Sequence, residues 1–269
     1  MGRIPGTAMS WDPQLFARHL KTRRFGRQLR YFTEIDSTNR WLTVHWSEFT
    51  LNGAVAVAEH QISGRGRFTR EWDDVPGKSL LFSVSIVSSR EENRAGFHQM
   101  LPAISLAKAL RNRLGDEYEI RLKWPNDVLL NDRKLAGILA ERFTAGNTTV
   151  TIVGVGINVN ADLRELSESA RAFGTTLFAE TGTITPREPL LADIINEWEP
   201  LYDSLRDGDT DSIRKTWLEL GPPIGTAITR MERGAEISGT FDGIGTCGQL
   251  LLRDQNGVVH EFFSGDILH

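Results

Sequence analysis

A change of pattern at Gly221-Pro222-Pro223 divides this chain of 269 residues into two unequal parts. The part before it mixes helical patterns with strand patterns joined by turns, whereas the fewer than fifty residues after it contain only short strand patterns. Helices and hairpins that do not alternate strictly are typical of α+β folds. We therefore predict two domains, at residues 1–222 and at residues 223–269.

The larger part contains amphipathic helical segments and apolar strand segments in an irregular order. Turn residues at Asn131-Asp132 separate two of the strands, so we expect a β-hairpin there. Helices are predicted at residues 11–20, 40–49, 97–114, 190–205 and 211–220. Strands are predicted at residues 31–35, 54–58, 79–87, 118–123, 128–130, 134–141 and 149–155.

The smaller part carries short strand patterns and a strong hairpin-turn signal at Asn256-Gly257. Its strands are predicted at residues 227–231, 237–242, 249–253 and 258–263. Four or five strands in so short a segment predict a small β-barrel. Such a unit buries too little apolar surface to be very stable alone, so we expect it to pack against the larger part.

The net charge and the cysteine content limit which partners and which kinds of stabilising site this chain can have. Lys and Arg number 31 against 35 Asp and Glu, a net charge of -4 that argues against duplex nucleic acid as the main partner. A single cysteine, Cys247, can form neither an internal disulfide nor a thiolate zinc site. The first ten residues lack the apolar core of a signal peptide, and no apolar run approaches the roughly 20 residues of a membrane span. We expect a cytoplasmic protein without a membrane partner.

The most polar candidate site is the segment Gly64–Trp72, with the sequence Gly-Arg-Gly-Arg-Phe-Thr-Arg-Glu-Trp. Glycines let the backbone approach a ligand, and successive N–H groups can hold an anion. The guanidinium groups of Arg65, Arg67 and Arg70 suit phosphate or carboxylate, and Trp72 can stack on a base. The alternative is a hydrated, charged surface loop. A Walker loop is excluded because no Gly-Lys-Ser/Thr sequence follows.

Two further segments place cations beside strands. In Lys123–Asp127 (Lys-Trp-Pro-Asn-Asp), the proline ends regular pairing, and the lysine, asparagine and aspartate could meet phosphate or magnesium. Since Pro, Asn and Asp all favour turns, an ordinary turn explains the same residues. In Arg133–Leu139, Lys134 enters an otherwise apolar strand, so its ammonium group must stay hydrated or paired.

Gly154–Asn160 and Asp36–Asn39 are the last two candidates. Two glycines within a strand indicate close approach by another group, or a β-bulge. The segment lacks the third glycine of a dinucleotide fingerprint. Asp36–Asn39 offers side chains suited to a ligand, although a helix N-cap explains Asp36 or Ser37 without one.

Taken together and in this order, the motifs resemble those of the biotin–protein ligases (biotin–[acetyl-CoA-carboxylase] ligases), from about Tyr31 to the C-terminus. This resemblance implies a mixed β-sheet flanked by helices, of the class II synthetase and biotin ligase type, followed by a small SH3-like β-barrel. The matching segments are Asp36–Asn39, Ala58-Glu59 with Gln61, Gly64–Arg67 with Arg70 and Trp72, Lys123–Asp127, Arg133–Leu139 and Gly154–Asn158.

The resemblance also implies the reaction. Biotin and ATP would form biotinyl-5′-AMP with Mg²⁺, and biotin would pass to a lysine of a biotin carboxyl carrier protein. Both partners of the first step are anions, so positive charge must be aimed at the reacting centre. The residues implied for biotin are Ser37, Thr38, Asn39, Gln61, Gly64, Arg65, Gly66, Arg67, Lys134, Gly137, Gly154 and Gly156. Those implied for ATP or the adenylate are Arg65, Arg67, Arg70, Trp72, Lys123, Asn126, Lys134 and Asn158.

Four side chains are expected to act in catalysis, namely Arg67, Lys123, Asp127 and Lys134. Asp127 is the candidate to act on the incoming lysine of the acceptor. An ordinary aspartate, with a pKa of about 3.9, is too weak a base to deprotonate that lysine efficiently, so we expect Asp127 to orient it. We expect the loop at residues 63–77 to be mobile without ligand and to order over the adenylate, which excludes water from a reactive anhydride. The residues that would bind the metal are not assigned.

The chain departs from the family pattern at two places. Phe68 and Thr69 stand where many relatives have Arg or Lys and Gly, which puts the ordering of the loop in doubt. Only about thirty residues precede Tyr31, too few for a three-helix DNA-binding unit, so we expect a monofunctional enzyme that does not bind DNA. The alternatives are a lipoate or octanoate ligase or transferase of the same fold, a biotin-sensing regulator, and a catalytically silent binding module. Monomer and homodimer both remain open.

Overall fold

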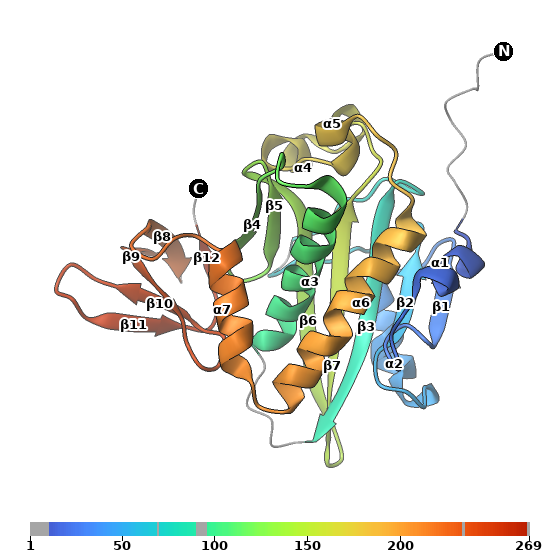
Figure 1. The fold of residues 1–269 in the computed structure, drawn as a ribbon, viewed down its shortest axis with the longest axis horizontal. Helices are drawn as coiled ribbons and strands as arrows, with labels where there is room; N and C mark the ends of the chain where they lie inside the picture. The colour runs from blue at the N-terminus through green and yellow to red at the C-terminus, as the bar shows by residue number, and fades with distance from the viewer. Residues whose placement is uncertain (1–10, 69, 90–95, 233–234, 268–269) are drawn as a thin grey trace.

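The computed structural model describes residues 11–68, 70–89, 96–232 and 235–267. Thr69, for which we predicted an effect on loop ordering, lies outside these ranges, as do the first ten residues of the larger predicted domain. Two β-sheets of different size are packed side by side, and the larger one carries the helices (Figure 1). In the described ranges, no helix is both long and apolar enough to span a bilayer.

The larger sheet has seven strands in the order β1-β2-β3-β7-β6-β5-β4. Strands β1 and β2 pair in parallel and all other neighbours are antiparallel, so the predicted mixed sheet is confirmed. The strands are β1 (Leu29–Phe32), β2 (Ala54–Ala58), β3 (Ser79–Ser89), β4 (Ile120–Lys123), β5 (Asp127–Leu130), β6 (Arg133–Ala145) and β7 (Thr148–Asn158).

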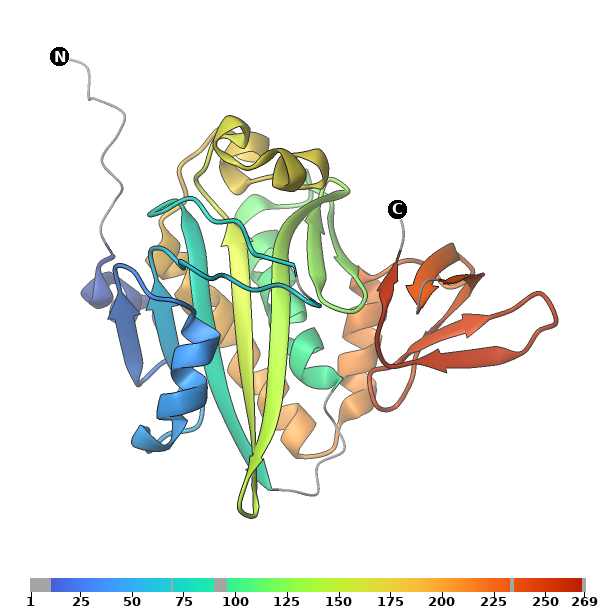
Figure 2. The same ribbon diagram turned by 180° about the vertical axis from the view of Figure 1, so that it is seen from behind.

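Helices cover the two faces of this sheet unequally. The long helices α3 and α6 lie across one face (Figure 1), whereas α2 lies on the opposite face (Figure 2). The α-helices are α1 (Pro13–His19), α2 (Thr38–His45), α3 (Phe97–Leu114), α4 (Glu168–Phe173), α5 (Leu177–Thr181), α6 (Arg187–Arg206) and α7 (Thr210–Leu220). The short helices α4 and α5, and the 3₁₀ turns Trp46–Glu48 and Leu163–Glu165, were not predicted.

The alternation along β3 explains which face holds the core. Leu80, Phe82 and Val84 are buried in the main apolar cluster beneath α3 and α6. Because successive side chains of a strand point to opposite faces, Ser83 and Ser85 are directed to the other face. A second, small apolar cluster around Leu42, Ala56, Val150 and Ile152 packs α2 on that face. The face that carries α2 therefore leaves room for polar side chains.

The smaller sheet has five antiparallel strands in the order β11-β10-β9-β8-β12. They are β8 (Ala227–Glu232), β9 (Ala235–Ile244), β10 (Leu250–Arg253), β11 (Val259–Phe262) and β12 (Asp266–Ile267). Gly257 has φ +82° in the turn predicted at Asn256-Gly257. Within the described residues, no pairing joins the edge strands β11 and β12, so closure into a barrel stays a prediction.

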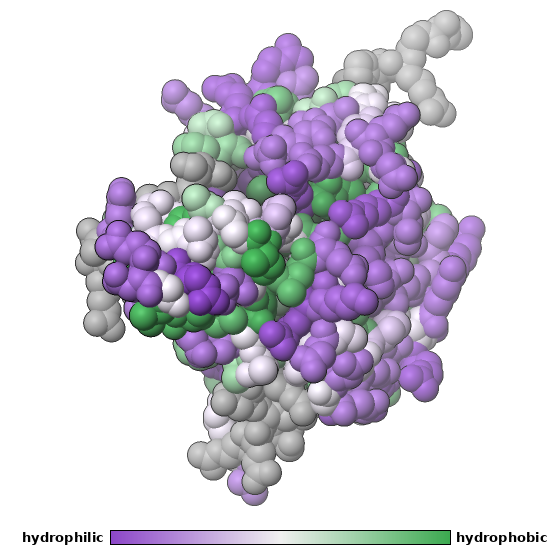
Figure 3. Space-filling model, turned by 60° about the vertical axis from the view of Figure 1, so that its left-hand side comes forward, coloured by the Kyte–Doolittle hydropathy of each residue, from purple (hydrophilic) through white to green (hydrophobic). Residues whose placement is uncertain are grey.

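The smaller sheet packs against the larger part, as its size led us to expect. The rings of Trp217 on α7 and Phe241 on β9 lie 6.0 Å apart, and Trp124 Nε1 donates to Gly248 O over 3.2 Å. Since α7 ends at Leu220 and only strands follow, we propose residues 1–222 and 223–269 as the two domains. Figure 3 shows apolar side chains gathered among polar ones on the side of this sheet. Its exposed apolar residues are Ile224, Val258, Val259 and Phe263.

Candidate functional site

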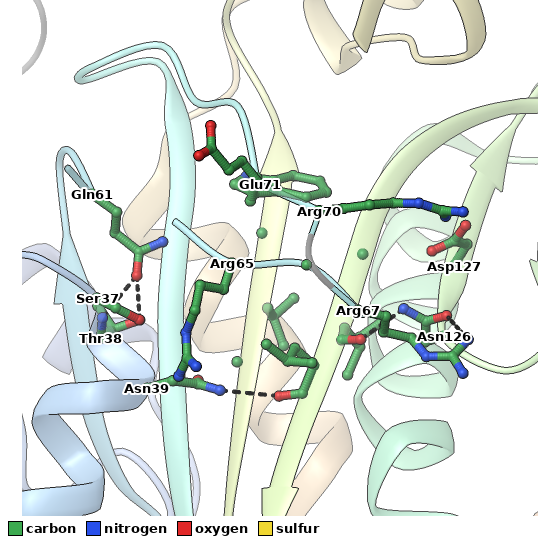
Figure 4. A pocket seen from close by; sticks show the side chains of 18 of the residues that line it. Ser37, Thr38, Asn39, Gln61, Arg65, Arg67, Arg70, Glu71, Asn126 and Asp127 are labelled. Carbon is green, nitrogen blue, oxygen red and sulfur yellow. Dashed lines mark hydrogen bonds between the residues drawn. The ribbon is translucent and has the colours of Figure 1, made fainter. Parts of the chain in front are cut away.

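A cavity opens on the α2 face of the larger sheet and collects most of the predicted site residues (Figure 4). It lies between the N-terminus of α2, strands β6 and β7, the start of β5 and the loop that follows β2. The predicted residues that line it are Ser37, Thr38, Asn39, Gln61, Arg65, Gly66, Arg67, Arg70, Trp72, Asn126, Asp127, Lys134, Gly137, Gly154 and Gly156. Residues distant in sequence therefore share one cavity.

The N-terminus of α2 supplies one end of the cavity. Ser37 occupies the N-cap position, but its side chain makes no capping hydrogen bond, so an ordinary side-chain cap does not explain it. Ser37, Thr38 and Asn39 are all buried. Gln61 Oε1 accepts from Thr38 N at 2.7 Å and from Thr38 Oγ1 at 3.0 Å. This end thus offers hydroxyl and amide groups in fixed positions.

Glu141 ties this end to the arginine-rich loop. Asn39 Nδ2 donates to Glu141 Oε2 over 2.7 Å, and Arg65 Nη2 donates to both carboxylate oxygens at 2.9 and 3.0 Å. Ser83 Oγ donates to Asn39 Oδ1 over 2.6 Å. Sequence reasoning missed Ser83 and Glu141. Serines alternate with apolar residues in β3, and this pattern could have indicated Ser83. For Glu141, the sequence carried no signal other than its position at the end of a predicted strand.

The glycines of β6 and β7 make room for two side chains of the chain itself. A Cβ atom on Gly154 would overlap Asn39 Oδ1, and one on Gly156 would overlap the Trp72 indole. A Cβ atom on Gly137 would lie 2.9 Å from the same indole. The close approach expected at these glycines is therefore made by Asn39 and Trp72 in this structure.

The loop Gly64–Trp72 folds back on itself over the cavity. Gly66 N donates to Arg70 O over 2.8 Å, and Trp72 N donates to Gly64 O over 3.0 Å. Phe68 near its tip has a left-handed φ of +55° and is 63% exposed. Arg65 and Arg70 line the cavity, so the loop is more than a hydrated surface segment.

The base of this loop is held by buried charges. His60 Nδ1 lies 2.9 Å from Asp74 Oδ2, and burial raises the pKa of Asp74 above its usual value. Arg187 on α6 donates to both carboxylate oxygens of Glu59, at 2.6 and 3.1 Å. Since Glu59 and His60 immediately precede Gln61, these pairs fix the strand end from which Gln61 reaches Thr38.

Lys134 and Asp127 form an ion pair at the opposite end of the cavity. Lys134 Nζ lies 2.8 Å from Asp127 Oδ1, and their side chains are 36% and 20% exposed. The same Nζ lies 5.8 Å from a ring centre of Trp72. The ammonium group is thus paired, as its place in an apolar strand requires. Asp127 is partly buried, and its contact with one ammonium group suits it to orienting another.

Arg67 reaches from the loop to both sheets. Its Nη1 donates to Gly265 O over 3.0 Å and lies 3.4 Å from Asn126 Oδ1. Asn126 Nδ2 in turn donates to Ile138 O over 2.8 Å. Figure 4 shows Arg67 and Asn126 close together on the side of the cavity away from Ser37 and Thr38.

Three predicted residues lie outside the cavity lining. Gly64 forms the base of the folded loop, and Lys123 ends β4 without lining the cavity. Asn158 is buried at the end of β7, where its Nδ2 donates to Thr175 O over 3.1 Å. Conversely, five lining residues were not among the predicted site residues, namely Glu71, Phe82, Ile138, Leu139 and Val155, and of these only Phe82 lies outside the motif segments.

The cavity therefore has two chemically different ends. Hydroxyl and amide groups gather near Ser37 and Gln61, and the cations Arg67, Arg70 and Lys134 gather toward Asp127. Leu139 and the Trp72 indole supply apolar side-chain surface to the lining. Such a site suits a ligand with a polar uncharged head, an apolar body and an anionic tail.

Comparisons with known proteins agree with this geometry. Residues 31–158 match the model of the Biotin/lipoate A/B protein ligase family. The chain is 32% identical over 234 residues to the bifunctional ligase/repressor BirA of Escherichia coli (strain K12), covering 87% of this chain and 71% of that protein. It is 32% identical over 211 residues to the biotin–[acetyl-CoA-carboxylase] ligase of Paracoccus denitrificans, covering 76% of this chain and 85% of that protein.

The fold is similar to a solved structure as well. The biotin protein ligase from Aquifex aeolicus, in complex with biotin and ATP, superposes with a TM-score of 0.74 at 26% sequence identity. The match covers 90% of this chain and 98% of the other. Since it spans almost the whole chain, both sheets belong to the shared architecture.

Proposed function

This chain belongs to the biotin–protein ligase family, and we propose that it activates biotin with ATP and transfers the biotinyl group to a lysine of a biotin carboxyl carrier protein. The observation that carries the proposal is the two-ended cavity. Biotin has a ureido group with N–H donors and a carbonyl acceptor, an apolar ring and chain, and a carboxylate. The hydroxyl and amide groups around Ser37, Thr38 and Gln61 match the ureido group.

In the first step, a carboxylate oxygen of biotin attacks the α-phosphorus of ATP. A new O–P bond forms, the bond to pyrophosphate breaks, and the product is the mixed anhydride biotinyl-5′-AMP. Arg67, Arg70 and Lys134 line the cation end of the cavity, where the anionic groups of the substrates meet. Fixed cations there offset the repulsion between carboxylate and phosphate and stabilise the charge that develops on the phosphate oxygens.

In the second step, the neutral amine of the acceptor lysine attacks the biotinyl carbonyl carbon. A C–N bond forms, the C–O bond to AMP breaks, and the amine loses a proton. Asp127 lies at the cation end and already binds an ammonium group, that of Lys134. An incoming lysine can be oriented by the same carboxylate.

Magnesium is part of the nucleotide substrate in this scheme. Among the residues that the structure describes, no group of three or more His, Cys, Asp or Glu side chains could hold a metal ion. Mg²⁺ commonly binds through substrate phosphates with few protein carboxylates. We therefore treat MgATP as the substrate, and Asp127 and Asn126, which both line the cavity, as oxygen ligands that the chain can offer to the metal.

Exchange of labelled pyrophosphate into ATP tests the first step. The exchange should depend on biotin, and a carrier-domain lysine should then become biotinylated. Lipoate and octanoate serve as competing substrates in the same assay. If either drives exchange and biotin does not, the chain is a lipoate-type or octanoate-type enzyme of the same fold.

A further inference from the structure

The smaller sheet enters the candidate site at one turn. Ser264 and Gly265 connect β11 to β12, and Gly265 O accepts a hydrogen bond of 3.0 Å from Arg67 Nη1. Arg67 is the loop residue that also approaches Asn126 in the larger sheet. The position of this cation thus depends on a backbone carbonyl of the smaller sheet.

A buried arginine holds this turn. Arg230 on β8 is 0% exposed, and its Nη2 donates to Ser264 O. Its guanidinium carbon lies 3.9 Å from the ring centre of Phe262. A buried guanidinium is costly unless hydrogen bonds and a favourable ring face replace its water. Arg230 is therefore held tightly against the chain segment that carries Gly265.

Gly265 is shaped for this contact. Its φ of +124° is a conformation that favours glycine, and a Cβ atom on it would overlap Arg230 Nη2. The absence of a side chain lets the guanidinium lie directly against the turn. Arg230, Ser264, Gly265 and Arg67 thus form a continuous chain of contacts from the smaller sheet to the cavity.

We propose that Arg230 is a positioning residue for Arg67. It fixes the Ser264-Gly265 turn, and the turn holds Arg67 at the cation end of the cavity. The kinetic part of this proposal rests on the proposed function, since it assumes that Arg67 faces the reacting phosphate. Loss of Arg230 should then free the turn, let Arg67 move, and weaken adenylate formation without touching the biotin end.

The first test needs no activity. Arg230→Leu removes the guanidinium and keeps an apolar side chain. Arg253→Leu is the matched control, since Arg253 on β10 pairs with Asp242 and with Gly257 O, in the same sheet. Amide hydrogen exchange of the peptide at residues 63–68 is measured in the ligand-free protein. It should be faster in Arg230→Leu and unchanged in Arg253→Leu; equal exchange in wild type and Arg230→Leu overturns the proposal.

The second test is a double-mutant cycle with Arg67→Ala, read as kcat/KM for ATP in pyrophosphate exchange. Arg230→Leu should lower kcat/KM by about 10- to 100-fold, the range expected for a misplaced catalytic group. It should have little further effect in the Arg67→Ala background, because coupled residues are not additive. An equal loss in both backgrounds means that Arg230 acts only through the fold, which overturns the proposal.

Two further variants test the same proposal if Arg230→Leu does not fold. Arg230→Lys keeps a cation near Ser264 O and should retain part of the activity. Gly265→Ala should give faster exchange at residues 63–68, because its Cβ atom displaces Arg230; unchanged exchange counts against the proposal. If wild type shows no biotin-dependent pyrophosphate exchange, the proposed function fails, and the hydrogen-exchange comparison still decides the role of Arg230.

Discussion

The cavity has two walls of different construction. The sheet wall consists of Lys134, Gly137, Gly154 and Gly156 on β6 and β7. These strands pair in unbroken register from Ala136–Ile157 to Ala145–Thr148, and Lys134, just before this ladder, pairs with Leu129 of β5. The loop wall is the segment Gly64–Trp72. It has few backbone hydrogen bonds of its own and is tied down by side chains, above all through Glu141 and Gly265.

This difference indicates what each wall does. A paired strand fixes its side chains whatever occupies the cavity, so the sheet wall sets the shape of the site. A loop held by one partly exposed ion pair and one side-chain hydrogen bond to a carbonyl opens at low free energy, because each such contact contributes only about 0–1.5 kcal/mol. Substitutions in the sheet wall should therefore change the chemistry most, and substitutions in the loop wall should change binding and local order.

Lys134→Met should give the largest effect. Methionine can replace the apolar stem of Lys134, so the free energy of unfolding should change by no more than about 1–2 kcal/mol. Loss of a cation at the carboxylate–phosphate junction should slow adenylate formation by about 10²–10³-fold. Lys108→Met is the control, since Lys108 pairs with Glu197 on the surface of the distant helices α3 and α6. A stable and nearly fully active Lys134→Met protein would remove Lys134 from the site.

Lowering the pH should reduce the free energy of unfolding through His98, which lies on α3, the helix packed behind the sheet wall. Burial, with repulsion from Arg142, lowers the pKa of His98 to about 4. The unfolded state binds the proton near pH 6.5 and the folded state does not, so stability is complete above 6.5 and falls as the pH drops toward 4. Linkage gives a loss of about 3 kcal/mol over this range. In His98→Gln this component should be missing from urea denaturation curves, and parallel pH profiles would contradict the assignment.

The sheet wall could be predicted from sequence better than the loop wall. Its strands were predicted at residues 134–141 and 149–155 and are observed at Arg133–Ala145 and Thr148–Asn158, and the turn at Asn131-Asp132 that precedes β6 has the two left-handed φ angles, +50° and +61°, that its residue types favour. Local propensity decides such elements. The parallel pairing of β1 with β2 joins segments far apart in sequence and carries no local signal.

The contacts of the loop wall were not predictable for the same reason. Nothing near Arg67 indicates that it meets Gly265, and nothing near Gly156 indicates that Trp72 fills the space above it. The motifs pointed to most of the residues that line the cavity, through their residue types and through the family resemblance. Which of them touch was decided by tertiary packing between segments distant in sequence.

Glu141→Gln should have a smaller effect than Lys134→Met. Glutamine can still accept from Asn39 Nδ2, but Arg65 loses a charged partner. The Arg65 side chain is 50% exposed, so the pair is worth at most about 1 kcal/mol. Biotin affinity, measured by calorimetry, should fall by about two- to fivefold. Glu165→Gln, which breaks the exposed pair with Lys78, is the control. A loss of more than a hundredfold would mean that Glu141 belongs functionally to the sheet wall.

Phe68→Gly should have the smallest effect on stability. Glycine relieves the strain of the left-handed φ of Phe68, which is worth about 1 kcal/mol. It also raises the conformational entropy of the unfolded chain, and it removes the contact between the Arg67 guanidinium and the Phe68 ring, 4.9 Å away, and both of these changes destabilise the fold. These terms oppose each other, so the free energy of unfolding should stay within about 0.5 kcal/mol of wild type. Phe173→Gly is the matched control: Phe173 is also exposed but ends α4, where glycine has no left-handed strain to relieve and should cost roughly 0.5 kcal/mol. A loss above about 1 kcal/mol in Phe68→Gly would show that the tip of the loop wall is as firmly built as the sheet wall, and the contrast between the walls would fail.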